Sequence, residues 1–300
     1  MTSRYRTVTR WVSRAMALAL VAGALDTAQL TTAAPASAVT GLEKVSSPTP
    51  TADSQASKTA IARCPSGKQV VGGGGWVHAV DRVAEDNLAL TELRPFQGYR
   101  DGYRVTAEEL IYTSGNWWVQ AYAICANPMS GHQIVTGTTS YSSQSRQHAK
   151  AVCPSGKRAI GSGARVNYAS TGEVALQIAR ASGSGDITRA QAREEANGYS
   201  GNWNVTAYAV CVQPPYGYEV VYGASSNRDS ESTKTAMATC PNGKRVHGAG
   251  AATIVNAPAG VALQVVYPYN DLRRAMAHAV ETTPTSADWD FIVFQAICAY

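Results

Sequence analysis

Two residues whose side chains could bind a ligand recur at matching places along the chain, a glutamate and a tryptophan eight residues after it. The pairs are Glu109 and Trp117, Glu195 and Trp203, and Glu281 and Trp289. A carboxylate repeated in this way could hold a ligand hydroxyl or a cation in each copy. It could also pair with a repeated lysine or accept hydrogen bonds from loop amides, and we favour this structural interpretation. The lysines in question are Lys68, Lys157 and Lys244.

The segment that begins at each tryptophan alternates with a period of two, which is typical of a β-strand. The tryptophans share a face with a cysteine, which favours buried packing near a disulfide over a sugar-stacking platform. The better ligand candidates lie on the opposite face. They are Trp118, Gln120 and Tyr122 in the first copy, and Asn204, Thr206 and Tyr208 in the second. Aromatic rings beside amides and hydroxyls suit sugar rings or a protein partner, and packing between copies is the competing interpretation.

Other catalytic and metal-binding patterns are missing from the sequence. The five histidines never occupy the same repeat position, and there is no HExxH, GxSxG or Cys/His ligand cluster. We therefore expect no catalytic residues, no metal and no cofactor, and we do not expect an enzyme. A hydrolase whose site is assembled from distant loops is the remaining enzymatic alternative.

Six cysteines fall into three similarly spaced pairs that anchor an internal repeat. The first members, Cys64, Cys153 and Cys240, each begin a CP[SN]GK motif, and the second members, Cys125, Cys211 and Cys298, follow at nearly the same distance in each copy. Two glycines, separated by one residue, stand at a fixed distance after the first cysteine of every copy. Pairing within each copy is favoured, and the alternative of Cys125–Cys153, Cys211–Cys240 and Cys64–Cys298 would close a ring.

These motifs belong to about six short strands in each copy. In the second copy the strands are expected near 131–140, 146–153, 157–166, 173–181, 187–196 and 202–211. The CP[SN]GK motif predicts a tight hairpin between the second and third strands, with proline at the first corner and glycine where φ is positive. The paired glycines predict a bulge or a close backbone approach. One extra residue between Trp289 and Cys298 predicts a bulge in the last strand.

The N-terminal segment 1–38 is expected to be a signal peptide. Four arginines precede an apolar run over 15–25, and Ala36-Ser37-Ala38 fits a cleavage site before Val39. Without this segment the chain holds 22 basic and 20 acidic residues, so no basic stripe suggests nucleic acid. No later stretch is apolar enough for a membrane span. We expect an extracellular protein with disulfides.

The expected architecture is all-β, with three tandem disulfide-stapled six-stranded antiparallel modules in pseudo-threefold packing. The modules are placed at 39–127, 128–213 and 214–300. A closed propeller-like or prism-like ring is the alternative. The motif C-P-x-G-K-x-x-x-G-x-G, followed by W-x-V-x-A-Y-A-x-C, resembles repeats of exported actinobacterial proteins of uncharacterised function, which implies export and no activity. The architecture is also similar to that of H-type lectins, whose small β-barrels trimerise.

The expected function is binding. We expect a secreted protein that recognises carbohydrate or a cell-surface polymer through its repeated modules, with one site in each copy used multivalently. The alternative is a factor that binds an extracellular protein, such as a protease inhibitor or a subunit of an exported assembly or toxin complex. The features found only in the first copy, Trp118, the run GGGGW and the insert FQGYRDGYR, favour that alternative. The oligomeric state stays open.

Overall fold

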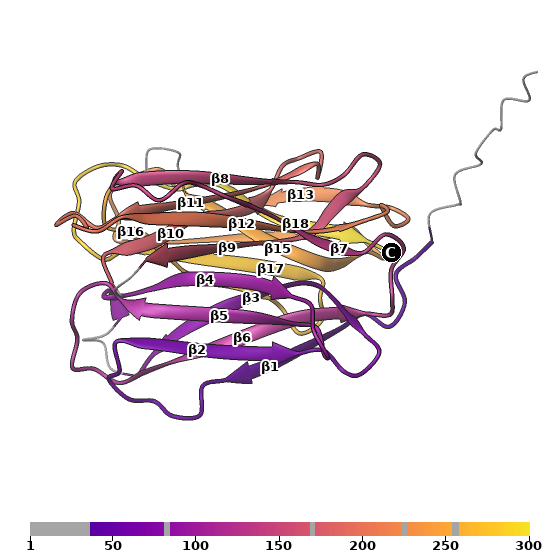
Figure 1. The fold of residues 1–300 in the computed structure, drawn as a ribbon, viewed down its shortest axis with the longest axis horizontal. Coiled ribbons are helices and arrows are strands. Elements are labelled where there is room, and N and C mark those ends of the chain that lie inside the picture. Colours follow the sequence, from indigo (N-terminus) through magenta and orange to yellow (C-terminus); the bar gives the residue numbers. More distant parts are fainter. Residues whose placement is uncertain (1–36, 81–84, 169–171, 224–226, 254–257) are drawn as a thin grey trace, which may run out of the picture. The chain divides into compact units, whose positions relative to one another are not determined.

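The computed structural model describes residues 37–300 except 81–84, 169–171, 224–226 and 254–257, so nearly all of the expected signal peptide lies outside it. The described chain is built from strands (Figure 1). Module 1 contains β1 (Glu43–Pro48), β2 (Ser57–Arg63), β3 (Gln69–Ala79), β4 (Leu88–Phe96), β5 (Gly102–Glu109) and β6 (Trp117–Ala126). Module 2 contains β7 (Gln133–Thr138), β8 (Arg146–Val152), β9 (Arg158–Tyr168), β10 (Val174–Ala181), β11 (Ile187–Glu194) and β12 (Trp203–Val212). Module 3 contains β13 (Glu219–Gly223), β14 (Thr233–Thr239), β15 (Arg245–Thr253), β16 (Val261–Pro268), β17 (Arg274–Glu281) and β18 (Phe291–Ala299).

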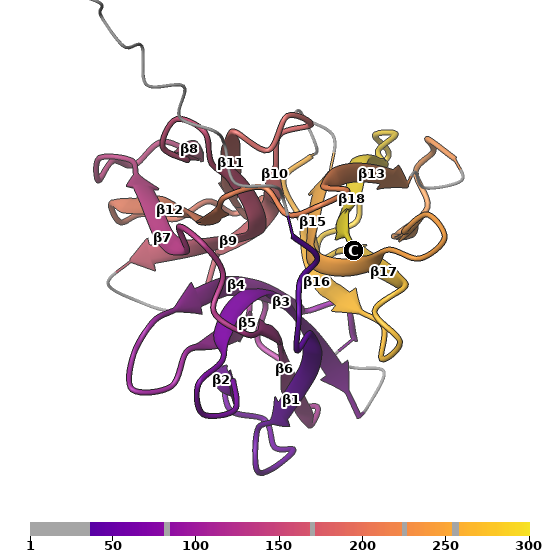
Figure 2. The ribbon, with the colours of Figure 1, turned by 90° about the vertical axis from the view of Figure 1, so that its right-hand side faces the viewer.

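Each six-stranded antiparallel sheet is shared between two modules. The orders are β1-β6-β3-β16-β17-β14 (sheet A), β2-β5-β4-β9-β12-β7 (sheet B) and β13-β18-β15-β10-β11-β8 (sheet C). A module therefore contributes three strands to each of two sheets and packs its core between them. Figure 2 shows the three modules around β3, β4, β9, β10, β15 and β16, the strands that join neighbours. The all-β fold with pseudo-threefold packing is confirmed, and no sheet closes into a barrel.

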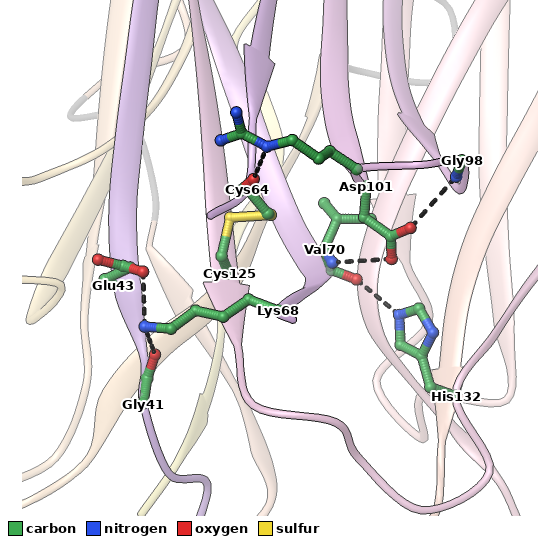
Figure 3. The surroundings of a disulfide bond; sticks show 10 residues. Gly41, Glu43, Cys64, Lys68, Val70, Gly98, Asp101, Cys125 and His132 are labelled. Atoms are coloured by element: carbon green, nitrogen blue, oxygen red, sulfur yellow. Dashed lines mark hydrogen bonds and ion pairs between the residues drawn. A yellow bond between two sulfur atoms is a disulfide. The ribbon is translucent and has the colours of Figure 1, made fainter. Parts of the chain in front are cut away.

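The disulfides join cysteines within each copy, as the favoured pairing predicts. Cys64–Cys125, Cys153–Cys211 and Cys240–Cys298 each have Cα atoms 5.7 Å apart. Each bond links the end of one three-stranded layer to the last strand of the other, so it fastens the two sides of the module. Figure 3 shows the first bond, whose Cys64 carbonyl accepts a hydrogen bond from Arg100 Nε at 2.7 Å. The strand that opens each module pairs with its own last strand, so β1 belongs to module 1.

The CP[SN]GK motif forms a tight turn, but the expected hairpin is wrong. The strands before and after it lie in different sheets, since β2 pairs with β5 and β3 pairs with β6. The Lys68 amide donates to the Pro65 carbonyl at 3.1 Å and Gly67 has φ of 79°. Proline is thus the first residue of the turn rather than its first corner. The motif reverses the chain across the core, from one layer of the module to the other.

The two repeated glycines let the modules touch. A side chain at Gly72 would overlap the His247 carbonyl, one at Gly161 the Val71 carbonyl, and one at Gly248 the Ile160 carbonyl, so β3, β9 and β15 approach in a closed cycle around the pseudo-threefold axis. The second set faces the strand of the neighbouring module. Its members are Gly74, Gly163 and Gly250. The predicted close backbone approach is therefore the contact between copies.

A bulge lies beside the first glycine in every copy. The register shifts leave Val71, Ile160 and His247 as the bulged residues, and all three are buried near the axis. The His247 ring donates from Nδ1 to the Arg245 carbonyl at 2.8 Å, while Nε2 has no hydrogen-bond partner among the described residues. Burial lowers the pKa of His247 to about 4. A second register shift, between Ala252 and Thr253 opposite β18, matches the extra residue predicted there.

Candidate binding surfaces

The repeated tryptophans are core residues bonded to buried carboxylates. Trp117, Trp203 and Trp289 have no exposed surface. Their indole N–H groups donate to Glu109 at 3.2 Å, to Glu194 at 2.8 Å and to Glu281 at 2.8 Å. A buried indole needs such an acceptor because an unpaired N–H costs free energy. These side chains hold each module together and leave no platform for a ligand.

The second copy uses Glu194 for this bond, not Glu195. The loop before Trp203 is one residue longer than its counterparts, so counting back eight residues reaches the neighbour of the equivalent glutamate. Glu195 instead crosses the module boundary, where its carboxylate accepts from Thr282 Oγ1 at 2.8 and 2.9 Å and from Thr283 Oγ1 at 3.3 Å. Burial raises the pKa of Glu195, and these hydrogen bonds oppose that shift.

The second oxygens of the other two glutamates accept from loop amides. Glu109 accepts from the Thr113 amide at 3.3 Å, and Glu281 accepts from the Thr285 amide at 3.2 Å. The lysines considered as partners contact other groups: Lys68 pairs with Glu43, Lys157 donates to the Gly131 carbonyl, and Lys244 pairs with Glu219. The candidate glutamates are therefore engaged in structural contacts.

The outward candidates of the first copy belong to an aromatic cluster on sheet A. Trp118 stacks on His78 with centroids 3.8 Å apart, and His78 stacks on Trp76 at 4.8 Å. Trp76 and Tyr122 both meet Tyr267 of module 3, at 5.2 and 5.0 Å. We call these five residues the aromatic face. Gln120 is half-buried on β6 between Trp118 and Tyr122.

A cavity of about 280 Å³ adjoins Trp76 and His78 at the boundary between modules 1 and 3. Polar groups on its wall include Glu85, Gln264 and His278. Gln264 is anchored across the boundary, because its Nε2 donates to the Leu88 carbonyl at 2.8 Å. Burial lowers the pKa of His78 to about 4, so this ring is neutral at pH 7. The cavity thus combines flat rings with a few fixed polar groups.

A lysine borders the aromatic face. Lys44 Nζ lies 4.6 Å from the Tyr122 centroid and 4.4 Å from the Tyr267 centroid, and donates to the Pro268 carbonyl at 2.9 Å. Burial lowers the pKa of Lys44 to about 8, and Asp271 opposes this shift. Burial also raises the pKa of Tyr122. The lysine fixes Tyr122 against the neighbouring module, so packing between copies accounts for part of this tyrosine's role.

The outward candidates of the second copy lie on sheet B and are buried. Asn204 and Thr206 both accept from Asn167 Nδ2, at 2.7 and 3.0 Å. Tyr208 is 9% exposed and contacts Arg94 of module 1. Alternation placed these three side chains on the correct face, but neighbouring side chains cover them, so they are not available as a ligand platform.

The centre of sheet B is an ion cluster of one carboxylate and three arginines. Glu92 is buried and contacts Arg94 at 2.7 Å, Arg104 at 3.2 Å and Arg165 at 3.8 Å. A polar cavity of about 390 Å³ lies beside it. The register makes Arg165 the equivalent of Trp76, and Arg94 the equivalent of Tyr267. The aromatic face therefore has no counterpart on sheet B.

Sheet C has a third kind of surface, with basic side chains on three neighbouring strands. They are Arg146 and Lys150 on β8, Arg180 on β10, and Arg189 and Arg193 on β11. These five residues are called the cationic face below. This grouping is not visible along the linear sequence, because a sheet gathers alternate residues of separate strands.

Sequence reasoning missed several members of these surfaces. Trp76 was noted only as part of a run unique to the first copy, and His78 and Tyr267 were not selected. Tyr267 lies near the end of the mostly apolar run VALQVVYP, which gives no alternation that would mark it as an outward residue. The same reasoning did not bring Arg180 and Arg189 together, since their pairing depends on the β10–β11 register.

The comparisons with known proteins do not identify the chain. No protein-family model matches it, and no curated protein sequence matches it significantly. Within the described ranges, no group of three or more His, Cys, Asp or Glu side chains could hold a metal ion. The part of the chain that the structure describes contains no helix long and apolar enough to cross a membrane. The three disulfides suit an oxidising, extracellular environment.

Proposed function

We propose that this protein is a secreted, non-catalytic binding protein that holds a carbohydrate or cell-surface polymer on its aromatic face. The observation that carries the proposal is the connected set of Trp76, His78, Trp118, Tyr122 and Tyr267 beside a cavity with fixed polar groups. Sugar rings offer C–H groups to an aromatic plane and hydroxyls to neighbouring amides and carboxylates. The cavity supplies both kinds of contact.

The three copies do not share this site. Trp76 corresponds to Arg165 and Ala252, because each stands at the same distance after the first cysteine of its module. Tyr122 corresponds to Tyr208, which is covered, and to Gln295. We therefore narrow the expectation of one site in each copy to a single aromatic site at the boundary between modules 1 and 3.

Binding can be followed through the tryptophans. Trp117, Trp203 and Trp289 are fully buried, so acrylamide quenching in the chain without its signal segment reports mainly on Trp76 and Trp118. A polymer that occupies the aromatic face should protect this fluorescence. We expect a panel of glycans and cell-wall polymers to contain one that does so, with affinity reduced at least about tenfold in Trp76→Ala.

Tyr99→Ala is the matched control, because Tyr99 is fully exposed in the insert and makes none of the ring contacts of the aromatic face. Its affinity should equal that of the wild type. The proposal fails if no polymer binds at high protein density, or if the polymer that binds is insensitive to Trp76→Ala.

An extracellular protein partner is the second candidate. It is favoured by the asymmetry of the aromatic face, to which the first copy alone gives Trp76 and Trp118. Interfaces between proteins are rich in such residues. A stoichiometric protein that co-purifies from culture fluid with the wild type but not with Trp118→Ala would select this candidate.

A further inference from the structure

The cationic face concentrates like charges in direct opposition. Arg180 is opposite Arg189, and Arg189 is opposite Lys150 on its other side. Four residues further along β11, beyond the pair of Gln191 and His148, Arg193 is opposite Arg146. Side chains in such positions are only about 5 Å apart at Cβ, and like charges there are destabilising. The row of Arg180, Arg189 and Lys150 is therefore an arrangement that a bound anion would relieve.

In sheet B a buried carboxylate lies beside the same arrangement of opposed arginines. Arg94 opposite Arg104 is the counterpart of Arg180 opposite Arg189. At the bulge beside them, Glu92 of sheet B corresponds to Ile178 of sheet C, since Glu92 is opposite Thr106 and Ile178 is opposite Gln191. The buried Glu92 contacts both Arg94 and Arg104. Sheet C has the two arginines and an isoleucine in place of the carboxylate.

Electrostatic effects of this crowding extend to the neighbouring groups. Burial lowers the pKa of Arg180, and Arg189 lowers it further while Tyr222 raises it. Burial, and then Arg146, Arg189 and Lys150, lower the pKa of His148, which lies between the cations on β8. The outer side of β8, β10 and β11 carries no carboxylate, because Glu194, the acid within these three strands, faces the core and bonds Trp203.

We propose that the cationic face binds an anionic polysaccharide or polyol polymer whose repeating units carry sulfate or phosphate groups, on a different sheet from the aromatic face. Arginine offers paired N–H donors that match the oxygens of such groups. Across the strands, Arg180, Arg189 and Lys150 follow one another about every 5 Å, and the next pair of cations, Arg193 and Arg146, lies about 13 Å along the strands, which suits a polymer with closely spaced anions that crosses them. The three strands carry no Trp, Tyr or Phe on which bases could stack, so such a polymer is favoured over a nucleic acid.

The test uses the disulfide-bonded protein without its signal segment and four probes: heparin, poly(glycerol phosphate), unsulfated dextran and a single-stranded DNA 20-mer. Affinity is measured by biolayer interferometry from 50 to 300 mM NaCl. We expect heparin or poly(glycerol phosphate) to bind, with affinity that falls as salt rises because bound counterions are released. The preference between the two assigns the anion as sulfate or phosphate. Dextran should not bind.

Two variants address the face in opposite ways. Arg180→Gln combined with Arg189→Gln removes cations, and Ile178→Glu places the carboxylate of sheet B on sheet C. Each should weaken polymer binding at least about tenfold, while the control Arg104→Gln on sheet B leaves it unchanged. If the double variant does not fold, Lys150→Gln at its exposed position must weaken binding on its own.

The proposal is overturned if neither charged polymer binds, or if DNA binds more tightly than both. It is equally overturned if Lys150→Gln and Ile178→Glu bind the polymer as the wild type does. Loss of binding in Trp76→Ala would also contradict it, since that residue belongs to the aromatic face. A protein that fails on the glycan panel can still bind heparin, so the two proposals can fail separately.

Discussion

Replacing His247 by isoleucine should stabilise the protein and remove part of its sensitivity to acid. His247 is the bulged residue of the third copy, and the other two copies hold Val71 and Ile160 at the same place near the axis. Its Nε2 is buried with no hydrogen-bond partner among the described residues. An unpaired buried acceptor costs about 1–3 kcal/mol, so His247→Ile should raise the free energy of unfolding at pH 7 by that order.

The effect should grow as the pH falls. The pKa of His247 is about 4 in the folded protein and about 6.5 in the unfolded chain. Between these values the unfolded state binds more protons, so stability is intact above pH 6.5 and is lost as the pH falls towards 4. Linkage puts the loss from this group at about 2 kcal/mol at pH 5. In His247→Ile this contribution is absent, whereas the contributions of other groups persist.

The assay is urea denaturation of both proteins at pH 7.5, 6 and 5 without reductant, so that the disulfides stay closed. The difference in unfolding free energy between variant and wild type should widen by about 2 kcal/mol from pH 7.5 to pH 5. A difference that stays constant with pH would refute the assignment of a neutral, buried imidazole. A variant less stable than the wild type at pH 7.5 would refute the claim that Nε2 is an unpaired acceptor.

Two further substitutions test the framework. Gly161→Ala should lower the thermal midpoint by more than about 10 °C or prevent folding, because its Cβ would overlap the Val71 carbonyl near the axis. Gly98→Ala, where a Cβ meets nothing closer than 3.8 Å, should leave the midpoint unchanged, and equal midpoints in the two variants would contradict the role of the glycine. Trp289→Phe should cost about 1–3 kcal/mol in urea denaturation, since Glu281 loses its indole partner in a buried place; no cost would show that the bond is dispensable.

Local pattern was enough to predict the strands. From Trp203 to Cys211, alternate side chains pack inside the module and the others lie on the outward side of the sheet. The structure has β12 there. The repeat narrowed the disulfide pairing to two patterns, and the favoured pattern, within each copy, is the one in the structure. The alternation of a strand and the spacing of the repeated cysteines can both be read from a single sequence.

Pairing between strands was beyond the same reasoning. The turn at Pro65 has the residues of a hairpin, yet its strands belong to opposite layers, and turn chemistry does not encode which sheet a strand joins. Glu195 was assigned the role of Glu194 because a loop one residue longer is invisible to a count along the chain. The cover over Tyr208 comes from Arg94 of another module, so its burial depends on a contact between copies.

Sharing every sheet between two modules has a consequence for how the three surfaces came to differ. A single module alone would expose β3 and β4 as open edges, and three identical chains could close those edges as a homotrimer. In such a trimer, one substitution would appear on all three faces at once. A chain that carries the three copies in tandem is free of that constraint. Symmetry is kept by the glycines at the axis and broken at the faces, where one sheet has stacked rings, one has a carboxylate among arginines, and one has opposed cations.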